Sequence, residues 1–224
     1  MRDRGGRSGR LSGALRVSLG FSRPRRGCIL PRMRKTTLAL VGAFSVISLP
    51  ALAAKPLKVT VNQITEKGVG TSAGTITIKE DKEGLVLETN LKGLPPGEHG
   101  FHLHEKASCD PGEKDGAVAA GIAAGGHYDP DATKAHKGPG GGGHKGDLPK
   151  LEVPENGAVK TKLKVAGLKL SDVEGRALMI HAGGDNYTDV PKPLGGGGAR
   201  IACGVIPGEA KAAEAKPAEP KPAK

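Results

Sequence analysis

The sequence Gly100-Phe101-His102-Leu103-His104 places two histidines two residues apart in an apolar stretch. Successive side chains of a β-strand point to opposite faces of the sheet, so residues i and i+2 share a face. The pattern predicts a strand whose two imidazoles project from one face, as two ligands of a single metal must. A pair of surface histidines would give the same short pattern, so this segment alone leaves both interpretations open.

Further strands are predicted on both sides of this segment. Apolar and polar residues alternate over 57–64, 75–78 and 85–88, and later apolar runs cover 158–165, 176–181 and 200–206. Gly68, Gly74, Gly84 and Gly97, together with Pro95-Pro96, separate the early strands at a spacing typical of hairpins. Many short strands with such turns predict an all-β antiparallel barrel or sandwich.

Two long segments, 105–150 and 182–199, are dense in Gly, Pro, Asp and Lys and predict loops. Loops of this length are usually functional or disordered. The last segment, 209–224, repeats Ala, Lys, Glu and Pro without large apolar residues. Such a composition cannot bury a core, so we expect a disordered tail.

Composition limits both the core and the class of partner. The chain of 224 residues has no Trp, two Tyr and three Phe, so its core must consist mainly of Val, Ile, Leu and Ala. The formal net charge of +11 comes from the start of the chain, because residues 1–53 contain ten Arg and one Lys against a single acid. A folded domain that binds nucleic acid would carry the basic patch itself. The sequence therefore excludes a nucleic-acid partner.

The basic start has an explanation of its own. Met33-Arg34-Lys35, an apolar run over 38–49 and the small residues before position 54 predict a secretory signal peptide over 33–53, cleaved after Ala53. Residues 1–32 fit no part of that design, and we interpret them as a mis-assigned or non-native extension. A twin-arginine signal at Arg25-Arg26 is the alternative. The predicted mature domain is 54–208, without a membrane span.

A second group of metal-binding side chains follows in the first long loop. His127, His136, His144 and Asp147 supply three imidazoles and one carboxylate, which can close a tetrahedral zinc site. A solvated His-rich loop is the alternative, since 138–143 is nearly all glycine. His181 adds a further histidine at the end of the predicted strand over 176–181.

The cysteines suggest one disulfide. Cys28 lies in the leader, which leaves Cys109 and Cys203 as a pair in a chain predicted to be exported. Disulfides form in such oxidising compartments. A pair of thiolate metal ligands is the alternative, although no other cysteine lies within a few residues of either one.

Taken together, five segments resemble successive motifs of the Cu,Zn superoxide dismutase family, in particular its bacterial periplasmic branch. The resemblance extends from about Lys58 to Ile206. The segments are Gly-Phe-His-Leu-His (100–104), Gly-Gly-His-Tyr-Asp-Pro (125–130), His-Lys-Gly-Asp-Leu (144–148), Met-Ile-His-Ala-Gly-Gly-Asp-Asn-Tyr (179–187) and Gly-Gly-Gly-Gly-Ala-Arg-Ile-Ala-Cys-Gly-Val-Ile (195–206).

The resemblance implies a fold, an activity and a role for each residue. The fold is an eight-stranded Greek-key β-barrel with two long functional loops, and the activity is disproportionation of superoxide at copper beside a structural zinc. The implied copper ligands are His102, His104, His127 and His181, and the implied zinc ligands are His127, His136, His144 and Asp147.

Five further roles follow from the same resemblance. Asp185 links the rings of His102 and His136, and Arg200 attracts the superoxide anion. His127 is catalytic as well as a ligand, and Cys109 and Cys203 form the disulfide. His99 is a structural histidine under the site.

The remaining expectations concern location, partners and a rival function. A periplasmic or otherwise exported protein is expected, with superoxide as substrate and a homodimer as a possible assembly. Lys106, Lys114 and Lys192 are candidates for guiding the substrate, although a solvated surface explains each of them as well. The rival function is a periplasmic copper and zinc buffering or delivery protein on the same fold, which would not need the arginine at position 200.

Overall fold

A computed structural model describes residues 55–208 of the chain. The predicted extension over 1–32, the predicted signal peptide over 33–53 and the predicted tail over 209–224 lie outside these residues. No helix within 55–208 is long and apolar enough to cross a membrane.

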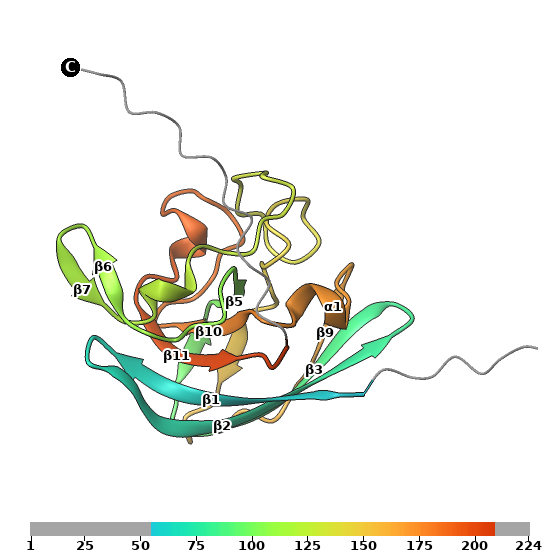
Figure 1. Ribbon diagram of the computed structural model, residues 1–224, viewed down its shortest axis with the longest axis horizontal. Helices are drawn as coiled ribbons and strands as arrows, with labels where there is room; N and C mark the ends of the chain where they lie inside the picture. Colours follow the sequence, from blue (N-terminus) through green and yellow to red (C-terminus); the bar gives the residue numbers. More distant parts are fainter. Residues whose placement is uncertain (1–54, 209–224) are drawn as a thin grey trace, which may run out of the picture. The chain divides into compact units, whose positions relative to one another are not determined.

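The described residues form an all-β fold whose main sheet has seven antiparallel strands, in the order β5-β10-β11-β1-β2-β3-β9. The sheet curls into a half-barrel (Figure 1). The first strand therefore pairs with the last. The strands are β1 (Leu57–Thr65), β2 (Gly68–Asp81), β3 (Gly84–Leu91), β5 (Phe101–His104), β9 (Lys162–Ala166), β10 (Ala177–His181) and β11 (Arg200–Val205).

Alternating apolar residues bury one face of these strands. Val59 and Val61 of β1 and Ile76 and Ile78 of β2 are fully buried, while their polar neighbours face outward. Phe101 is among the largest side chains of the same core. Burying apolar area at about 25 cal/mol per Å² is the main force that holds such a sheet together. The all-β antiparallel class predicted from the sequence is confirmed.

Two further strands form a pair that is separate from the main sheet. β4 (Gly97–His99) and β8 (Leu151–Val153) form a two-stranded antiparallel sheet that is not hydrogen-bonded into the main sheet. Leu151 and Val153 nevertheless pack into the common core. The segment just before β8 is also bridged to β5, through His102 and Asp147.

Gly74 differs from the sequence prediction, because it lies inside β2 and does not separate two strands. Its φ is +127°, and the pairing of β1 with β2 changes register between Val61 and Asn62, beside it. An extra residue in one strand produces such a bulge, which glycine accommodates because it has no Cβ. The sequence showed the glycine but could not show that the neighbouring strand continues past it.

The predicted strand over 158–165 starts too early. β9 begins at Lys162, and Val159 contributes only an isolated bridge to Leu91. The two predicted loops also contain short elements. The elements are β6 (Gly112–Lys114), β7 (Ala117–Ala119), η1 (Ile122–Ala124) and η2 (Leu194–Gly196), and a short helix α1 (Leu170–Val173) precedes β10.

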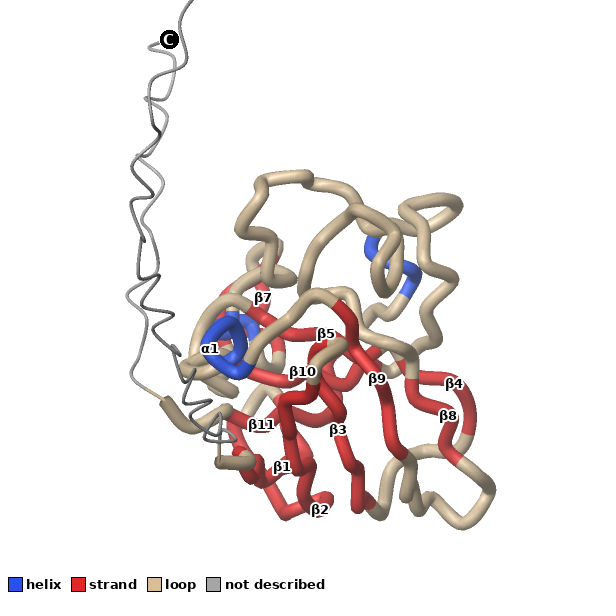
Figure 2. Tube along the Cα trace, turned by 90° about the vertical axis from the view of Figure 1, so that its right-hand side faces the viewer, coloured by secondary structure: helices blue, strands red, loops and turns tan. Residues whose placement is uncertain are grey.

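The two long loops, 105–150 and 182–199, lie on the same side of the sheet, as both views show (Figures 1 and 2). β5 and β11 flank β10. Strand β10 therefore carries His181 between the histidines of β5 and the arginine that begins β11. The topology gathers residues from positions 102 to 200 at one end of the sheet.

Candidate metal centre

The histidines of β5 occupy one face of the strand, as the alternation predicts. Phe101 and Leu103 pack in the apolar core, while His102 and His104 project from the opposite face and are fully buried. Met179 of β10 pairs with His102. The strand thus holds both imidazoles rigidly between the core and the loops above it.

Four histidines form a first group. One ring nitrogen from each of them lies within 4.8 Å of the others, and all four side chains are buried. Its members are His102, His104, His127 and His181. These residues come from β5, from the first long loop and from the end of β10, so only the folded chain brings them together.

Each ring of this group uses one nitrogen for orientation and leaves the other without a partner. His102 Nε2 lies 2.8 Å from Asp185 Oδ2, and His104 Nδ1 donates to the Gly125 carbonyl at 2.9 Å. The opposite nitrogens have no hydrogen-bond partner. These unpartnered atoms are His102 Nδ1, His104 Nε2, His127 Nε2 and His181 Nε2.

Four convergent, buried and unpartnered nitrogens are costly unless something binds them. A metal ion ligated by imidazole satisfies all four, and histidine ligands are typically oriented through their other nitrogen in this way. Imidazole donors are suited to copper. The residues present therefore fit a copper ion.

Three histidines and one carboxylate form a second group. Asp147 Oδ1 lies 3.0 Å from Nδ1 of His127, 3.0 Å from Nδ1 of His136 and 3.3 Å from Nδ1 of His144. A carboxylate oxygen has about two lone-pair sites, so three nitrogens exceed what it can accept. A cation shared by the four atoms satisfies them all, and this donor set is typical of zinc. His127 belongs to both groups.

Asp185 lies between the two groups. Its two oxygens are each 2.8 Å from a ring nitrogen, Oδ2 from His102 Nε2 and Oδ1 from His136 Nε2. The side chain is buried, and Oδ1 also accepts the Tyr187 backbone N–H at 2.7 Å. In both rings Nε2 faces Asp185, while Nδ1 faces the metal-binding group to which the histidine belongs. The carboxylate therefore fixes both ring orientations at once.

Burial decides which of these groups carry charge. It lowers the pKa of His102, His104 and His181 and lowers that of His127 to about 4. The imidazoles of the first group are thus neutral at neutral pH, as metal ligands must be.

His136 behaves in the opposite way. Burial opposes its protonation, but Asp147 and Asp185 outweigh burial and raise its pKa to about 9. For Asp147 and Asp185, burial raises the pKa of the carboxyl group. Their histidine partners outweigh burial and hold both pKa values well below the usual range. Both carboxylates are therefore ionised at neutral pH and favour a positive charge between them.

Arg200 lies beside the first group. It pairs with His181 across β11 and β10, and its guanidinium donates to the carbonyls of Gly121 and Gly125 at 2.5 and 2.7 Å. The Gly125 carbonyl also accepts from His104. Arg200 is partly buried, so its charge is held in place next to the histidines.

Cys109 and Cys203 form the predicted disulfide, with 5.7 Å between their Cα atoms. Because Cys203 lies three residues after Arg200, the bridge attaches the first long loop to β11 near the arginine. His99 has both ring nitrogens near carbonyl oxygens, at 2.7 Å from His181 and 2.8 Å from Pro95. It lies under the site and offers no free nitrogen.

Sequence reasoning missed three residues that hold the loops. Asp189 accepts the backbone N–H groups of His136 and Leu194, both at 2.9 Å. Tyr187, with φ of +60°, accepts the Lys150 backbone N–H at 3.1 Å. Each joins the second long loop to the first. Their partners in the first long loop are 53 and 37 positions away in the sequence, so spacing within one segment could not show these contacts.

Arg176 is the third such residue. Its guanidinium lies 3.7 Å from the Tyr128 ring centroid and donates to the Glu105 carbonyl at 2.9 Å. Arg176 therefore connects Glu105, which follows His104, with Tyr128, which follows His127. The sequence offered one signal, since Arg176 and Arg200 are the only arginines after residue 53.

Comparison with known proteins agrees with this geometry. Residues 72–206 match the family model described as copper/zinc superoxide dismutase. The chain is 50% identical over 175 residues to the superoxide dismutase [Cu-Zn] of Escherichia coli K12, which covers 78% of this chain and 99% of the relative. It is 47% identical over 171 residues to that of Brucella abortus, covering 76% and 98%.

Two solved structures are also similar. The Cu/Zn superoxide dismutase from Brucella abortus matches with a TM-score of 0.67 at 50% identity, covering 68% of this chain and 99% of the other. The monomeric copper, zinc superoxide dismutase from Salmonella enterica matches with a TM-score of 0.62 at 53% identity, with the same coverage.

The fold and the paired histidine groups define a metal-dependent oxidoreductase with an all-β scaffold. The chain belongs to the copper/zinc superoxide dismutase family. Its activity is the disproportionation of superoxide to dioxygen and hydrogen peroxide, and its metals are copper and zinc.

Proposed function

We propose that the two groups divide the metals as follows. The first group, His102, His104, His127 and His181, holds copper, and the second, His127, His136, His144 and Asp147, holds zinc. The observation that supports this assignment most directly is the set of unpartnered nitrogens at the centre of the first group. His127 serves both ions because Nε2 faces the first group and Nδ1 lies 3.0 Å from Asp147.

Copper held by the first group would supply one-electron redox chemistry, taking an electron from one superoxide and returning it to a second. We propose that the chain supplies position, charge and a proton. Arg200 attracts the anion, and the carbonyls of Gly121 and Gly125 keep its guanidinium beside His104 and His181. His127 Nε2 can hold a proton whenever it is not engaged as a ligand, and it would give that proton to the departing peroxide, which takes its second proton from solvent.

The rival function, metal buffering or delivery, is not favoured. It requires the ligands but not a cation fixed at the copper side. Here Arg200 is held by two backbone carbonyls and by the nearby disulfide. An arginine positioned in this way is suited to an anionic substrate.

Single ligand changes test the division of metals. His181 belongs to the first group alone and His144 to the second alone. We expect His181→Ala to lose copper and activity while it keeps zinc, and His144→Ala to lose zinc first. Metal content measured beside superoxide turnover checks both. Loss of both metals together from His181→Ala would contradict the assignment, as would negligible turnover of the fully metallated parent.

Export and assembly are proposed on the sequence alone. We propose that 33–53 directs export to the periplasm, that 1–32 is not translated and that 209–224 is an extension beyond the enzyme domain. Intact-mass measurement of the precursor and the mature protein tests the first two. The homodimer stays a prediction, and sedimentation equilibrium tests it.

A further inference from the structure

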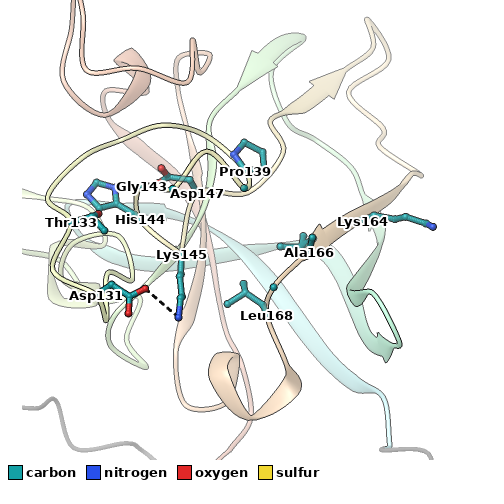
Figure 3. Close-up of a pocket in the computed structure, with 14 residues that line it drawn as sticks. Asp131, Thr133, Pro139, Gly143, His144, Lys145, Asp147, Lys164, Ala166 and Leu168 are labelled. Carbon is teal, nitrogen blue, oxygen red and sulfur yellow. Dashed lines mark hydrogen bonds and ion pairs between the residues drawn. The ribbon is translucent and has the colours of Figure 1, made fainter. Parts of the chain in front are cut away.

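A cavity of about 430 Å³ lies beside the second histidine group (Figure 3). The glycine-rich part of the first long loop forms one wall, with His144 and Asp147, and residues 164–168 form the other wall. In liquid water each molecule occupies about 30 Å³. The cavity therefore has room for a small cation together with its own water molecules.

The side chain of His144 is the least buried of the four in the proposed zinc group. It is 9% exposed, whereas the side chains of His127, His136 and Asp147 are 1% exposed or less. Because His144 also lines the cavity, its exposed edge faces the solvent that fills it. An ion that comes from solvent on this side meets His144 first and then Asp147.

The charges around the cavity do not repel a cation. Each lysine of the lining is paired with an acid, Lys145 with Asp131 at 3.3 Å and Lys164 with Glu83 at 3.2 Å. Asp131 itself lines the cavity, and Figure 3 shows its ion pair with Lys145. Asp147 also lines the cavity, and its fully buried carboxylate lies beside His144.

The glycine wall can move without repacking the core. A Cβ added at Gly140 or Gly142 would meet nothing within 4 Å, so these residues lie against open space. The turn is closed by a 3.2 Å bond from the Gly141 backbone N–H to the Gly138 carbonyl, and a 3.0 Å bond from the His144 backbone N–H to the Ala135 carbonyl joins its base. Widening this side costs few contacts.

We propose that this cavity is the route by which zinc enters and leaves its site. The inference rests on the proposed assignment of zinc to His127, His136, His144 and Asp147. Arg200, by contrast, lies beside the first group and repels cations there. Zinc therefore exchanges through a passage separate from the side on which the superoxide anion is attracted.

Obstruction of the cavity tests the route. Ala166 lies on the exposed face of β9 and lines the cavity, so Ala166→Trp places a large ring in it, and Ala166→Leu a smaller one. The matched control is Ala117→Trp, an exposed strand position on β7 outside the cavity. The readouts are exchange of bound zinc with isotopically enriched zinc in the holoenzyme, and the zinc Kd from chelator competition.

A blocked route slows entry and exit by the same factor and leaves the Kd unchanged. We expect exchange to slow several-fold in Ala166→Leu and more in Ala166→Trp, with no change in Ala117→Trp. Unchanged exchange in both Ala166 variants would overturn the route, and so would slower exit accompanied by a tighter Kd. If the parent protein binds no stoichiometric zinc, the proposed function itself fails, which separates the two results.

Discussion

At the scale of single residues, Arg200 is the side chain that we propose attracts the substrate. Replacement by alanine removes the cation beside His104 and His181. We expect Arg200→Ala to lower kcat/KM roughly tenfold or more, because a focused charge of this kind raises arrival rates by about 10 to 10³. Activity should also depend less on ionic strength. Stopped-flow turnover at several salt concentrations, with metal content matched, measures both effects.

Arg200→Lys is the matched variant. It keeps the positive charge, but an ammonium group lacks the planar fork of donors with which the guanidinium reaches both the Gly121 and the Gly125 carbonyl. It should retain most of the salt dependence. An Arg200→Ala variant with the parent's salt dependence would contradict the attraction of the anion by this residue.

Asp185 allows a second prediction at this scale. Its two oxygens accept from His102 and His136, and asparagine offers only one acceptor oxygen. One of the two rings therefore loses its orientation in Asp185→Asn. We expect metal affinity to fall about 10 to 100-fold, measured by chelator competition. Asp110→Asn, an exposed carboxylate, is the control, and equal affinities in both variants would contradict the orienting role.

At the scale of elements, the bulge in β2 makes Gly74 sensitive to substitution. A Cβ at this position would contact the Asn90 backbone carbonyl, and φ is +127°. Gly68 offers a comparison, since its φ is +115° but a Cβ there meets nothing within 4 Å. Both changes to alanine strain the backbone, by about 1 to 3 kcal/mol. Gly74→Ala adds crowding of roughly 1 to 3 kcal/mol.

Urea unfolding of the two variants measures the difference. Equal free energies of unfolding for Gly74→Ala and Gly68→Ala would show that crowding against β3 contributes nothing.

The disulfide acts between elements, because it joins the first long loop to β11. Cys109 and Cys203 are 94 positions apart in the sequence. Closing a loop of this length restricts the unfolded chain, so Cys109→Ser with Cys203→Ser should lower the free energy of unfolding by roughly 2 to 5 kcal/mol. Chemical denaturation of the metallated protein measures this. The reduced parent protein is the control and should lose a similar amount.

At the scale of the whole molecule, the proposed ligand assignment predicts that the metals hold the loops. The proposed ligands come from β5, β10 and the first long loop, while β1, β2 and β3 contribute none. Chelation should therefore lower the thermal midpoint and increase amide exchange mainly over 120–150 and 182–199. Hydrogen exchange with mass spectrometry checks this, and a uniform increase that includes β1 to β3 would contradict it.

Much of the fold and site could be predicted from sequence, because the information was local. Alternation over 57–64 and 85–88 predicted strands, and all seven proposed metal ligands lie close together in the structure as two groups. Other features depended on distant partners. Gly74 was interpreted as a break because only the pairing with β1 shows that the strand continues. Strand β8 has three residues, which is too short to show an alternation of apolar and polar side chains.

The sequence by itself determined the all-β class, the donor side chains and their order, since side-chain period and ligand chemistry are properties of short segments. Only the tertiary structure decided which nitrogen of each histidine is free, that Asp189 and Arg176 hold the loops, and that a cavity opens beside His144. These features depend on contacts between residues tens of positions apart. Such contacts are set by packing the whole chain and leave no pattern in any one segment.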